Sequence, residues 1–449
     1  MKEFINNLKG DKVIWAFIAL LALISFMPVY SASSNLAYGA NGSGNTVSFL
    51  IKHFAHVGIG FLIVYLVHKV PYHYFKAISM IALPIVWMLL LYTLWQGKTI
   101  GGANASRWIN IPFIGIGFQT STLASMVLMV YVARYLAKKR EVEDSFQKSA
   151  LELWLPVFAI LMLILPANFS TAALIFAMVS MLVFVGKYPL KYLGIIIGTG
   201  IIALTFFILI AKAFPDAFPN RVDTWVSRIE NFTSDKPDED NYQIEKAKIA
   251  IATGGFYGVG PGKSVQKNFL PQSSSDFIYA IIVEENGLIG AVVIMFLYIM
   301  LFIRFLIASH KANTLFGKLL VVGLGFPIVF QALINMAVAV ELLPVTGQTL
   351  PLISSGGSSI WMTCVSLGII LSVTKKDEEI AQEILEKAKR EEALQRLIER
   401  EMNGELDDEE EKNEEKNDEE ESEYTNEKVE QRYAIEDLSD NPMKAVMGK

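Results

Sequence analysis

Long apolar runs recur along the chain, and they limit its fold more than any other feature. A helix needs about 20 mostly apolar residues to cross a bilayer. Ten runs approach or exceed this length, at 13–31, 47–68, 73–96, 115–136, 151–167, 169–186, 190–213, 278–306, 316–340 and 350–373. Lipid cannot satisfy backbone polar groups, so each run should be a helix. The sequence therefore predicts an all-α polytopic membrane protein with about ten transmembrane helices.

Composition agrees with this assignment and excludes several other classes of protein. Of 449 residues, 53% are hydrophobic and only 19% are charged, whereas soluble domains carry about 25% charged residues. The single cysteine, Cys364, rules out an intrachain disulfide framework. No basic block stands apart from the loops, which disfavours nucleic-acid binding.

Basic residues are distributed unevenly between the connecting loops. They gather before residue 13 and in the loops near 70, 140, 188, 310 and 375, whereas 32–46 and 341–349 contain none. Short loops rich in Lys and Arg face the cytoplasm. Both termini are therefore expected in the cytoplasm, with a long extracytoplasmic loop at about 214–277 between helices 7 and 8.

The C-terminal region differs in kind from the apolar body at 1–374. Residues 375–449 contain 13 basic and 27 acidic residues. Apolar residues recur at helical spacing up to about 403, which predicts a cytoplasmic amphipathic helix over 375–403. The acidic stretch 404–449 should be disordered. The tail is either a solvating extension or a helix that docks a partner.

A glycine-rich run lies near the end of the outer loop. Five glycines stand between Gly254 and Gly262, and Lys263 and Lys267 follow. Glycines let a backbone approach a ligand closely and present N–H groups to an anion. The run suits a phosphate or diphosphate, and the alternative is a flexible turn.

Acidic residues follow this run. Asp276 directly precedes an apolar helix, so it is either a helix N-cap or a general base at the outer membrane surface. Glu284 and Glu285 lie inside that helix, where acidic groups usually face a cavity or a partner. Lys52 and His53 are the candidates for pairing with them.

The last apolar run begins unusually. Prolines at 344 and 351 precede Gly356-Gly357, which four serines flank. Small residues allow close helix packing. Alternatively, the run starts irregularly and lines a polar cavity.

Together these stretches resemble the SEDS family (shape, elongation, division and sporulation) of polytopic peptidoglycan polymerases. The strongest matches are 258–285 and 343–359; Arg107-Trp108-Ile109 and Tyr242-Gln243 also resemble family elements. The resemblance covers about 10–373. It is closer to the division member than to the elongation member.

The resemblance implies polymerisation of lipid II into glycan strands at the outer face of the cytoplasmic (inner) membrane, at the division septum. It implies a class B penicillin-binding protein and other division proteins as partners, with Mg²⁺ or Mn²⁺ as a candidate cation and no organic cofactor. Asp276 falls on the family's essential aspartate. The other candidate residues are Lys263, Gln266, Lys267, Arg221, Arg228 and Ser358 for substrate binding, and Lys52, Arg107, Glu284 and Glu285 for the cavity or structure.

The chain also departs from the family pattern. Ser274-Ser275 replace a His-Thr pair, and Thr122, Ser125 and Asn168 stand at positions that differ from the family elements. We therefore expect no functional role for the last three residues. The rival functions are an elongation-type polymerase, a lipid II flippase and a division scaffold.

Overall fold

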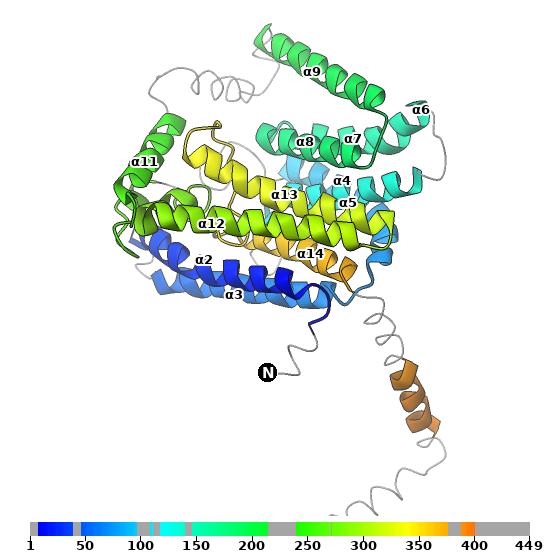
Figure 1. The fold of residues 1–449 in the computed structure, drawn as a ribbon. Coiled ribbons are helices and arrows are strands. Elements are labelled where there is room, and N and C mark those ends of the chain that lie inside the picture. Colours follow the sequence, from blue (N-terminus) through cyan, green and yellow to red (C-terminus); the bar gives the residue numbers. More distant parts are fainter. Residues whose placement is uncertain are drawn as a thin grey trace, which may run out of the picture. The chain divides into compact units, whose positions relative to one another are not determined.

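The computed structural model describes residues 8–38, 46–96, 108–110, 117–139, 146–213, 239–270, 272–375 and 388–399. The chain divides into two compact units, Met1–Lys375 and Lys376–Lys449. The first unit contains all of the apolar runs, and Figure 1 shows its helices in sequence colours.

Each predicted apolar run corresponds to a helical segment. Within the described residues, eight helices are long and apolar enough to cross a membrane, and two further apolar helices, α8 and α14, have 17 residues each. The helical segments are α2 (Lys12–Tyr38), α3 (Thr46–Val67), η1 (Tyr72–Tyr74) with α4 (Phe75–Gln96), α5 (Thr120–Lys139), α6 (Phe146–Ser149) with η2 (Ala150–Trp154) and α7 (Leu155–Ile164), α8 (Phe169–Val185), α9 (Leu190–Ala213), α12 (Ile278–Lys311), α13 (Leu315–Ala339) and α14 (Gly357–Val373). The polytopic helical fold is confirmed.

The connections contain structure that the apolar pattern did not predict. Strands β1 (Trp108–Asn110) and β2 (Gly117–Gln119) pair in antiparallel fashion, so α5 begins at Thr120 rather than near 115. The long loop contains helix α11 (Glu239–Gly254) and a short turn, η4 (Gln266–Asn268). Short loop strands carry no long apolar run, so a search for membrane spans passes over them.

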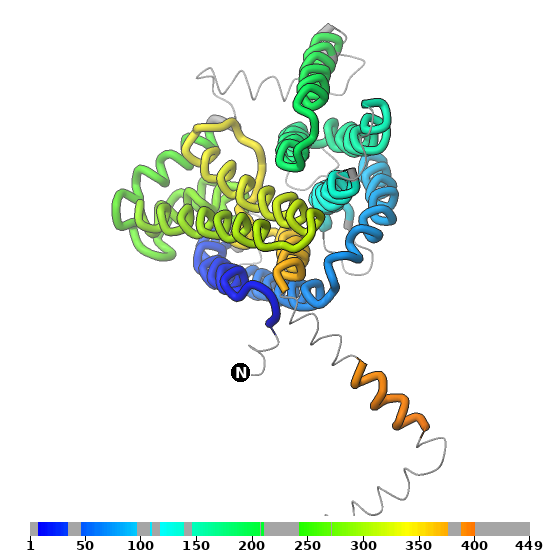
Figure 2. Tube along the Cα trace, turned by 45° about the vertical axis from the view of Figure 1, so that its right-hand side comes forward, coloured from blue at the N-terminus to red at the C-terminus, as the bar shows by residue number. Residues whose placement is uncertain are grey.

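The helices of the first unit pack in an extensive bundle. Helix α12 packs against α2, α11 and α13, and α14 packs against α3 and α13. Helix α5 lies between α4 and α13. The tube view in Figure 2 shows α12 and α13 side by side, with α2 and α14 close to them. The first helix, α2, therefore packs against α12, although the two are far apart in sequence.

Small residues allow the closest of these helix contacts. A Cβ on Gly60 of α3 would lie 2.8 Å from Cys364 Sγ of α14, and one on Gly325 of α13 would lie 2.6 Å from the ring of Phe305. Such contacts stabilise helix pairs in membranes, where lipid provides no hydrophobic driving force between helices. The packing interpretation of the last apolar run holds at Gly357, because a Cβ there would lie 2.7 Å from the ring of His56 in α3.

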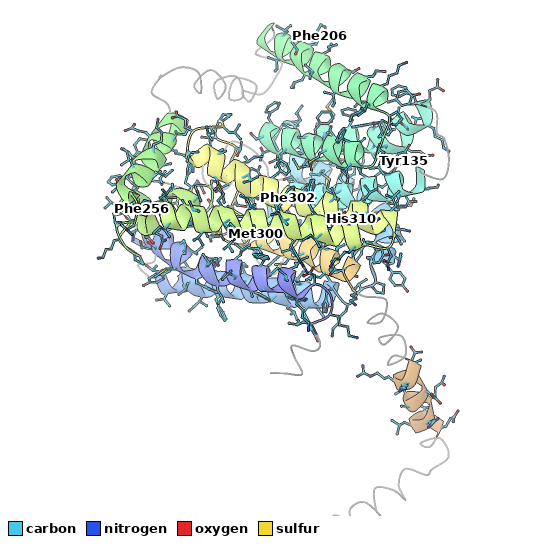
Figure 3. All side chains as sticks on the ribbon, in the orientation of Figure 1. Tyr135, Phe206, Phe256, Met300, Phe302 and His310 are labelled. Atoms are coloured by element: carbon cyan, nitrogen blue, oxygen red, sulfur yellow. The ribbon has the colours of Figure 1, made fainter. Side chains whose placement is uncertain are left out.

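One end of the bundle is joined through Asp11. Its carboxylate accepts a hydrogen bond from Val13 N (2.9 Å) at the start of α2 and forms an ion pair with Arg304 Nε of α12 (2.7 Å). Its own N–H donates to Thr374 Oγ1 (2.9 Å), directly after α14. Figure 3 labels His310 near this end of α12 and Phe256 at the opposite end. Three helices are thus tied together far from Asp276.

Helix α12 is not continuous. Gly287 has φ 65° and ψ −164°, so a kink separates 278–286 from 288–311. Only glycine adopts such a conformation readily. Glu284 and Glu285 therefore lie in a short helical segment between the Asp276 turn and the kink.

The second unit contains a short described helix. Residues 388–399 are helical and exposed, with an ion pair between Arg396 and Glu392. Leu394, Leu397 and Ile398 are exposed on it. The expected amphipathic helix at 375–403 is therefore helical over 388–399, and the remainder after 375, together with the acidic stretch 404–449, lies outside the described residues.

Candidate functional site

Asp276 lies in a turn at 272–277 that leads into α12, and its side chain is half-buried. The N-cap position of α12 is occupied by Phe277, not by Asp276. Gly347 faces the carboxylate: a Cβ built on Gly347 would lie 3.5 Å from Asp276 Oδ2. The φ of Gly347 is 67°, a conformation that favours glycine. The segment after α13 therefore passes next to the Asp276 carboxylate with no side chain between them.

The glycine-rich run packs against the kink of α12. Val259 N donates to the carbonyl oxygen of Glu284 (2.9 Å), and Gly260 N donates to that of Glu285 (3.0 Å). Beyond the kink, Leu288 N donates to Gly255 O (2.9 Å). These glycines serve a backbone-to-backbone contact, which neither the phosphate-binding interpretation nor the flexible turn anticipated.

Both buried glutamates bond to the segment that follows this run. Glu284 is fully buried and accepts hydrogen bonds from the Ser264 hydroxyl, from Val265 N (2.9 Å) and from Gln266 N (3.3 Å). Glu285 accepts hydrogen bonds from the Ser31 hydroxyl and from Ser264 N (3.4 Å). The N–H groups of 264–266 are therefore already bonded to carboxylates, so they are not presented to an anion.

The expected pairing of these glutamates with Lys52 or His53 is not formed among the described residues. Lys52 is exposed, with its Nζ 5.6 Å from the centre of the Phe49 ring. His53 is buried and bonds through Nε2 to Ser25 Oγ (2.8 Å). Consecutive residues of a helix point about 100° apart, which explains why one of these side chains faces outward and the other inward.

The predicted substrate-binding residues of the outer loop occupy different environments. Lys263 is exposed. Lys267 Nζ donates to Gly262 O (2.7 Å) and lies 3.2 Å from Ser31 Oγ. Gln266 is half-buried, and its Oε1 has no hydrogen-bond partner among the described residues. These contacts therefore do not bring Lys263 and Lys267 together with Asp276 in one binding site.

The remaining predicted residues give less information. Ser358 is 1% exposed in the first turn of α14, and its Oγ has no hydrogen-bond partner within the described part of the chain. Arg107, Arg221 and Arg228 lie outside the described residues. Their predicted roles remain predictions.

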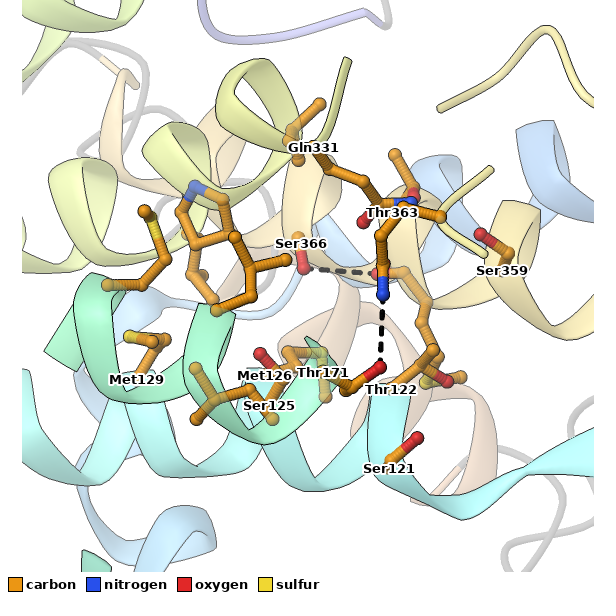
Figure 4. Close-up of a pocket in the computed structure, with 18 of the residues that line it drawn as sticks. Ser121, Thr122, Ser125, Met126, Met129, Thr171, Gln331, Ser359, Thr363 and Ser366 are labelled. Carbon is orange, nitrogen blue, oxygen red and sulfur yellow. Dashed lines mark hydrogen bonds between the residues drawn. The ribbon is translucent and has the colours of Figure 1, made fainter. Parts of the chain in front are cut away.

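A cavity of about 80 Å³ with a mixed polar and apolar lining lies between α5, α8, α13 and α14 (Figure 4). Its lining combines hydroxyl and amide groups with apolar side chains, and every lining residue is uncharged. The polar members are Ser121, Thr122, Ser125, Thr171, Gln331, Gln348, Ser359, Thr363 and Ser366. The last apolar run contributes to it, and residues 350–356, before α14, are not helical. The irregular start that the sequence suggested is therefore confirmed.

The segment after α13 lies between this cavity and Asp276. Gln348 Nε2 donates to Thr171 Oγ1 of α8 (3.0 Å), and Gln331 Nε2 donates to Thr349 O (2.9 Å). The hydroxyls of Thr349 and Ser359 are 3.0 Å apart. The loop that passes Asp276 is thus bonded directly to residues that line the cavity.

Sequence reasoning missed most of the cavity. Thr122 and Ser125, for which we expected no functional role, both line it, as does Thr171. The available signal was a set of hydroxyl residues one helical turn apart on the apolar helix at 120–139, which places them on one face. Asn168 has a structural role instead: its side chain caps α8 by accepting a hydrogen bond from Thr171 N (3.1 Å).

The described residues offer few side-chain ligands for a divalent cation. The described part of the chain contains no group of three or more His, Cys, Asp or Glu side chains that could hold a metal ion. Mg²⁺ is commonly bound by one or two carboxylates together with substrate phosphates. The described residues therefore do not fit a site made entirely of protein ligands, and a cation would depend mainly on substrate phosphates.

Comparison with known proteins agrees with this architecture. Residues 11–379 match the model of the FtsW/RodA/SpoVE family, described as cell cycle proteins. The chain belongs to this family.

Its relatives include proteins named probable peptidoglycan glycosyltransferase FtsW. The protein from Thioalkalivibrio sulfidiphilus is 31% identical over 367 residues (81% of this chain and 89% of the relative), and that from Hydrogenovibrio crunogenus is 32% identical over 379 residues (83% and 93%).

Solved structures share the fold of this SEDS-family chain. A chain of a peptidoglycan synthase complex that coordinates polymerization and crosslinking aligns with a TM-score of 0.62 and 23% identity, covering 81% of this chain and 97% of that one. The rod shape determining protein RodA of Thermus thermophilus aligns with a TM-score of 0.56 and 22% identity, over 81% and 96%. The SEDS resemblance and the multi-pass membrane fold are therefore confirmed.

Proposed function

We propose that this protein is an FtsW-type peptidoglycan glycosyltransferase that polymerises lipid II into glycan strands. The proposal depends on one observation above all: a carboxylate, Asp276, stands beside Gly347 at the end of a membrane bundle that belongs to the FtsW/RodA/SpoVE family. Relatives that share about 31% of the aligned residues carry this activity in their names.

The reaction requires one base. The 4-hydroxyl of one sugar attacks the anomeric carbon of another, a C–O bond forms, and the bond from that carbon to the diphosphate breaks. Asp276 takes the hydroxyl proton and later releases it to solvent. The diphosphate is a weak base and leaves without protonation, so it needs charge stabilisation only. Attack opposite the leaving group converts an α-linked sugar into a β linkage.

Cations for the leaving diphosphate would come from the outer loop. Lys263 is exposed, and Lys267 is near the surface of the same segment, so both can meet a ligand from outside. Arg221 and Arg228 complete the proposed set. Since Lys267 is bonded to Gly262 O here, binding of the diphosphate would exchange that hydrogen bond for a charge-assisted one.

The cavity suits a neutral part of the substrate better than its diphosphate. Hydroxyl and amide side chains offer donors and acceptors without charge, which matches the hydroxyl groups of a sugar. A diphosphate would remain uncompensated there. We therefore assign the charged part of the substrate to the loop and keep the cavity for neutral polar groups.

A divalent cation is part of the proposal. Mg²⁺ or Mn²⁺ would be held mainly by the substrate phosphates, beside the lysines and arginines of the outer loop, and when bound it would add positive charge near the leaving group. Loss of polymerisation on chelation, with recovery on addition of Mg²⁺ or Mn²⁺, would support this arrangement.

The proposal extends to a partner and a location. One structural neighbour is a chain of a peptidoglycan synthase complex that couples polymerization to crosslinking. We assign a class B penicillin-binding protein and other division proteins as partners. The assigned site is the division septum of the inner membrane, with both termini in the cytoplasm.

The decisive experiment supplies lipid II to the detergent-purified full chain, with and without a cognate penicillin-binding protein, and measures glycan length. Wild-type protein should make long strands in at least one condition. Asp276→Asn keeps the size and polarity of the side chain but removes the base. It should lose about 10²–10⁴-fold in rate while inserting normally into the membrane.

Other results would identify the rival functions. Movement of lipid II across a vesicle membrane without any polymer would indicate a flippase. Full complementation of a depleted strain by Asp276→Asn would indicate a scaffold. Wild-type rates from purified Asp276→Asn would end the assignment of Asp276 as the base.

A further inference from the structure

Three consecutive carbonyl groups of the Asp276 turn accept hydrogen bonds from other segments of the chain. Ser355 N donates to Ser274 O (2.8 Å), Ser354 Oγ donates to Ser275 O (2.6 Å), and Asn335 Nδ2 donates to Asp276 O (2.6 Å). The first two donors belong to the segment before α14, and the third belongs to α13. The backbone on both sides of the Asp276 carboxylate is thus held from outside its own turn.

Asn335 connects the turn to the loop that faces it. The side chain is 1% exposed, and its Nδ2 also donates to Gln348 O (2.7 Å). One amide group therefore fixes the carbonyl of Asp276 relative to the residue after Gly347. Because Gly347 lies against Asp276 Oδ2, this bridge also sets the distance between the carboxylate and the loop.

Ser354 is held equally firmly. It is 2% exposed, and its Oγ accepts a hydrogen bond from Leu350 N (2.7 Å) while donating to Ser275 O. The segment around it contains a buried leucine, Leu352, with φ 65°. A left-handed conformation is unfavourable for an L-residue other than glycine. Such strain persists only where the surroundings determine the conformation.

A second contact supports the strained segment. Tyr298 of α12 is fully buried, and its hydroxyl donates to Pro351 O, next to Leu352. Helix α12 begins just after Asp276, so the same helix follows the turn and supports the segment that holds it. The contacts therefore form a closed set that uses α12, α13 and the segment before α14.

We infer that Asn335 and Ser354 are positioning residues that hold the carboxylate of Asp276 in place for proton transfer. The inference rests on the proposed function, because it assumes that Asp276 is the base. Neither side chain is proposed to touch the substrate. Each fixes the backbone of the turn, and a displacement of about 1 Å at a reacting group can lower a rate by about 10²-fold.

The test compares Asn335→Leu and Ser354→Ala with wild type in the lipid II assay. Asn335→Leu keeps a similar size without a donor, and Ser354→Ala removes only the hydroxyl. Ser79→Ala is the matched control, because Ser79 is 2% exposed in α4 and its hydroxyl bonds only to Lys76 O of its own helix (2.9 Å). We expect kcat to fall about 10-fold to 10²-fold in each test variant with KM changed less than about 3-fold. Ser79→Ala should retain wild-type kcat.

Further measurements separate positioning from general stability. Ser354→Thr keeps the hydroxyl and should recover at least half of the wild-type kcat. In the Asp276→Asn background, Asn335→Leu and Ser354→Ala should cause no further loss of rate, because no base remains to be positioned. Amide hydrogen exchange should rise at 272–277 in both variants and stay unchanged in the helix beyond the kink.

Each outcome decides a different claim. Wild-type kcat in both Asn335→Leu and Ser354→Ala would overturn the positioning role while leaving the polymerase assignment intact. Equal rate losses in the wild-type and Asp276→Asn backgrounds would also overturn it, since they would indicate a structural effect. A wild-type chain that forms no polymer, with or without its partner, would instead overturn the proposed function.

Discussion

Gly254, the last residue of α11, lies so close to Val283 that a Cβ on Gly254 would approach the Val283 carbonyl oxygen to 2.1 Å. The same kind of approach recurs four residues later in the chain, where a Cβ on Gly258 would lie 2.2 Å from Glu285 O. These contacts make the glycine-rich run a rigid support for the first segment of α12. They explain Gly254 and Gly258 without a bound anion, whereas Gly255, Gly260 and Gly262 have positive φ values that favour glycine.

Substitution of Gly254 should therefore be costly. We expect Gly254→Ala to lower the unfolding temperature in detergent by several degrees, because the obstacle is backbone and overpacking typically costs about 1–3 kcal/mol. Gly58→Ala is the control, since a Cβ on this helical glycine of α3 would meet nothing within 4 Å. Equal unfolding temperatures for the two variants would show that the loop relaxes freely.

Removal of the Glu284 carboxylate should destabilise the same region. Glu284→Ala removes the acceptor of the buried Ser264 hydroxyl and of the partly buried N–H groups of Val265 and Gln266, and a buried unsatisfied group costs about 1–3 kcal/mol. Glu284→Gln keeps one acceptor oxygen and should lose less. Thermal unfolding should rank wild type above Glu284→Gln and Glu284→Ala lowest. The account fails if Glu284→Ala unfolds at the wild-type temperature.

The ion pair at the opposite end of the bundle should contribute measurably to stability. Arg304 and Asp11 are 28% and 9% exposed, so solvent screens the pair only in part. Arg304→Ala removes the ion pair, whereas Asp11→Ala also removes the cap of α2, worth about 1 kcal/mol. A double-mutant cycle should give a coupling energy of at least about 0.5 kcal/mol. Purely additive effects on unfolding would contradict a direct interaction.

Filling the cavity should inhibit the proposed reaction. Ser125→Leu introduces three additional carbon atoms into a space of about 80 Å³ and should reduce the polymerisation rate at least about 10-fold. Ser125→Ala removes only the hydroxyl and should keep activity within a few-fold of wild type. The lipid II assay checks both variants, with unfolding temperatures as the control for folding. An unchanged rate in Ser125→Leu would separate the cavity from the reaction.

The sequence predicted the elements of this fold better than the contacts between them. Each long apolar run became a helical segment, because length and hydropathy alone determine whether a segment can span a bilayer. The break at Gly287 could not be predicted in the same way. Its positive φ depends on the backbone of Phe256 and Gly258, which reach the kink only through the tertiary fold.

The same distinction holds for the candidate site, where the sequence identified Asp276 but not the contacts around it. Asp276 was found through a family motif, and its position before α12 follows directly from the sequence. Asn335 carried no comparable signal, since a lone amide in an apolar helix has many potential partners. The pairing of Lys52 with the buried glutamates was wrong because charge complementarity does not specify which face of a helix points inward.

The uncharged lining of the cavity has a consequence for how this protein responds to external pH. Serine, threonine, glutamine and methionine neither gain nor lose protons over the range of acidity in which bacteria live. The hydrogen bonds of the cavity lining therefore do not depend directly on pH. A response of the protein to external acidity would have to act through groups outside this cavity.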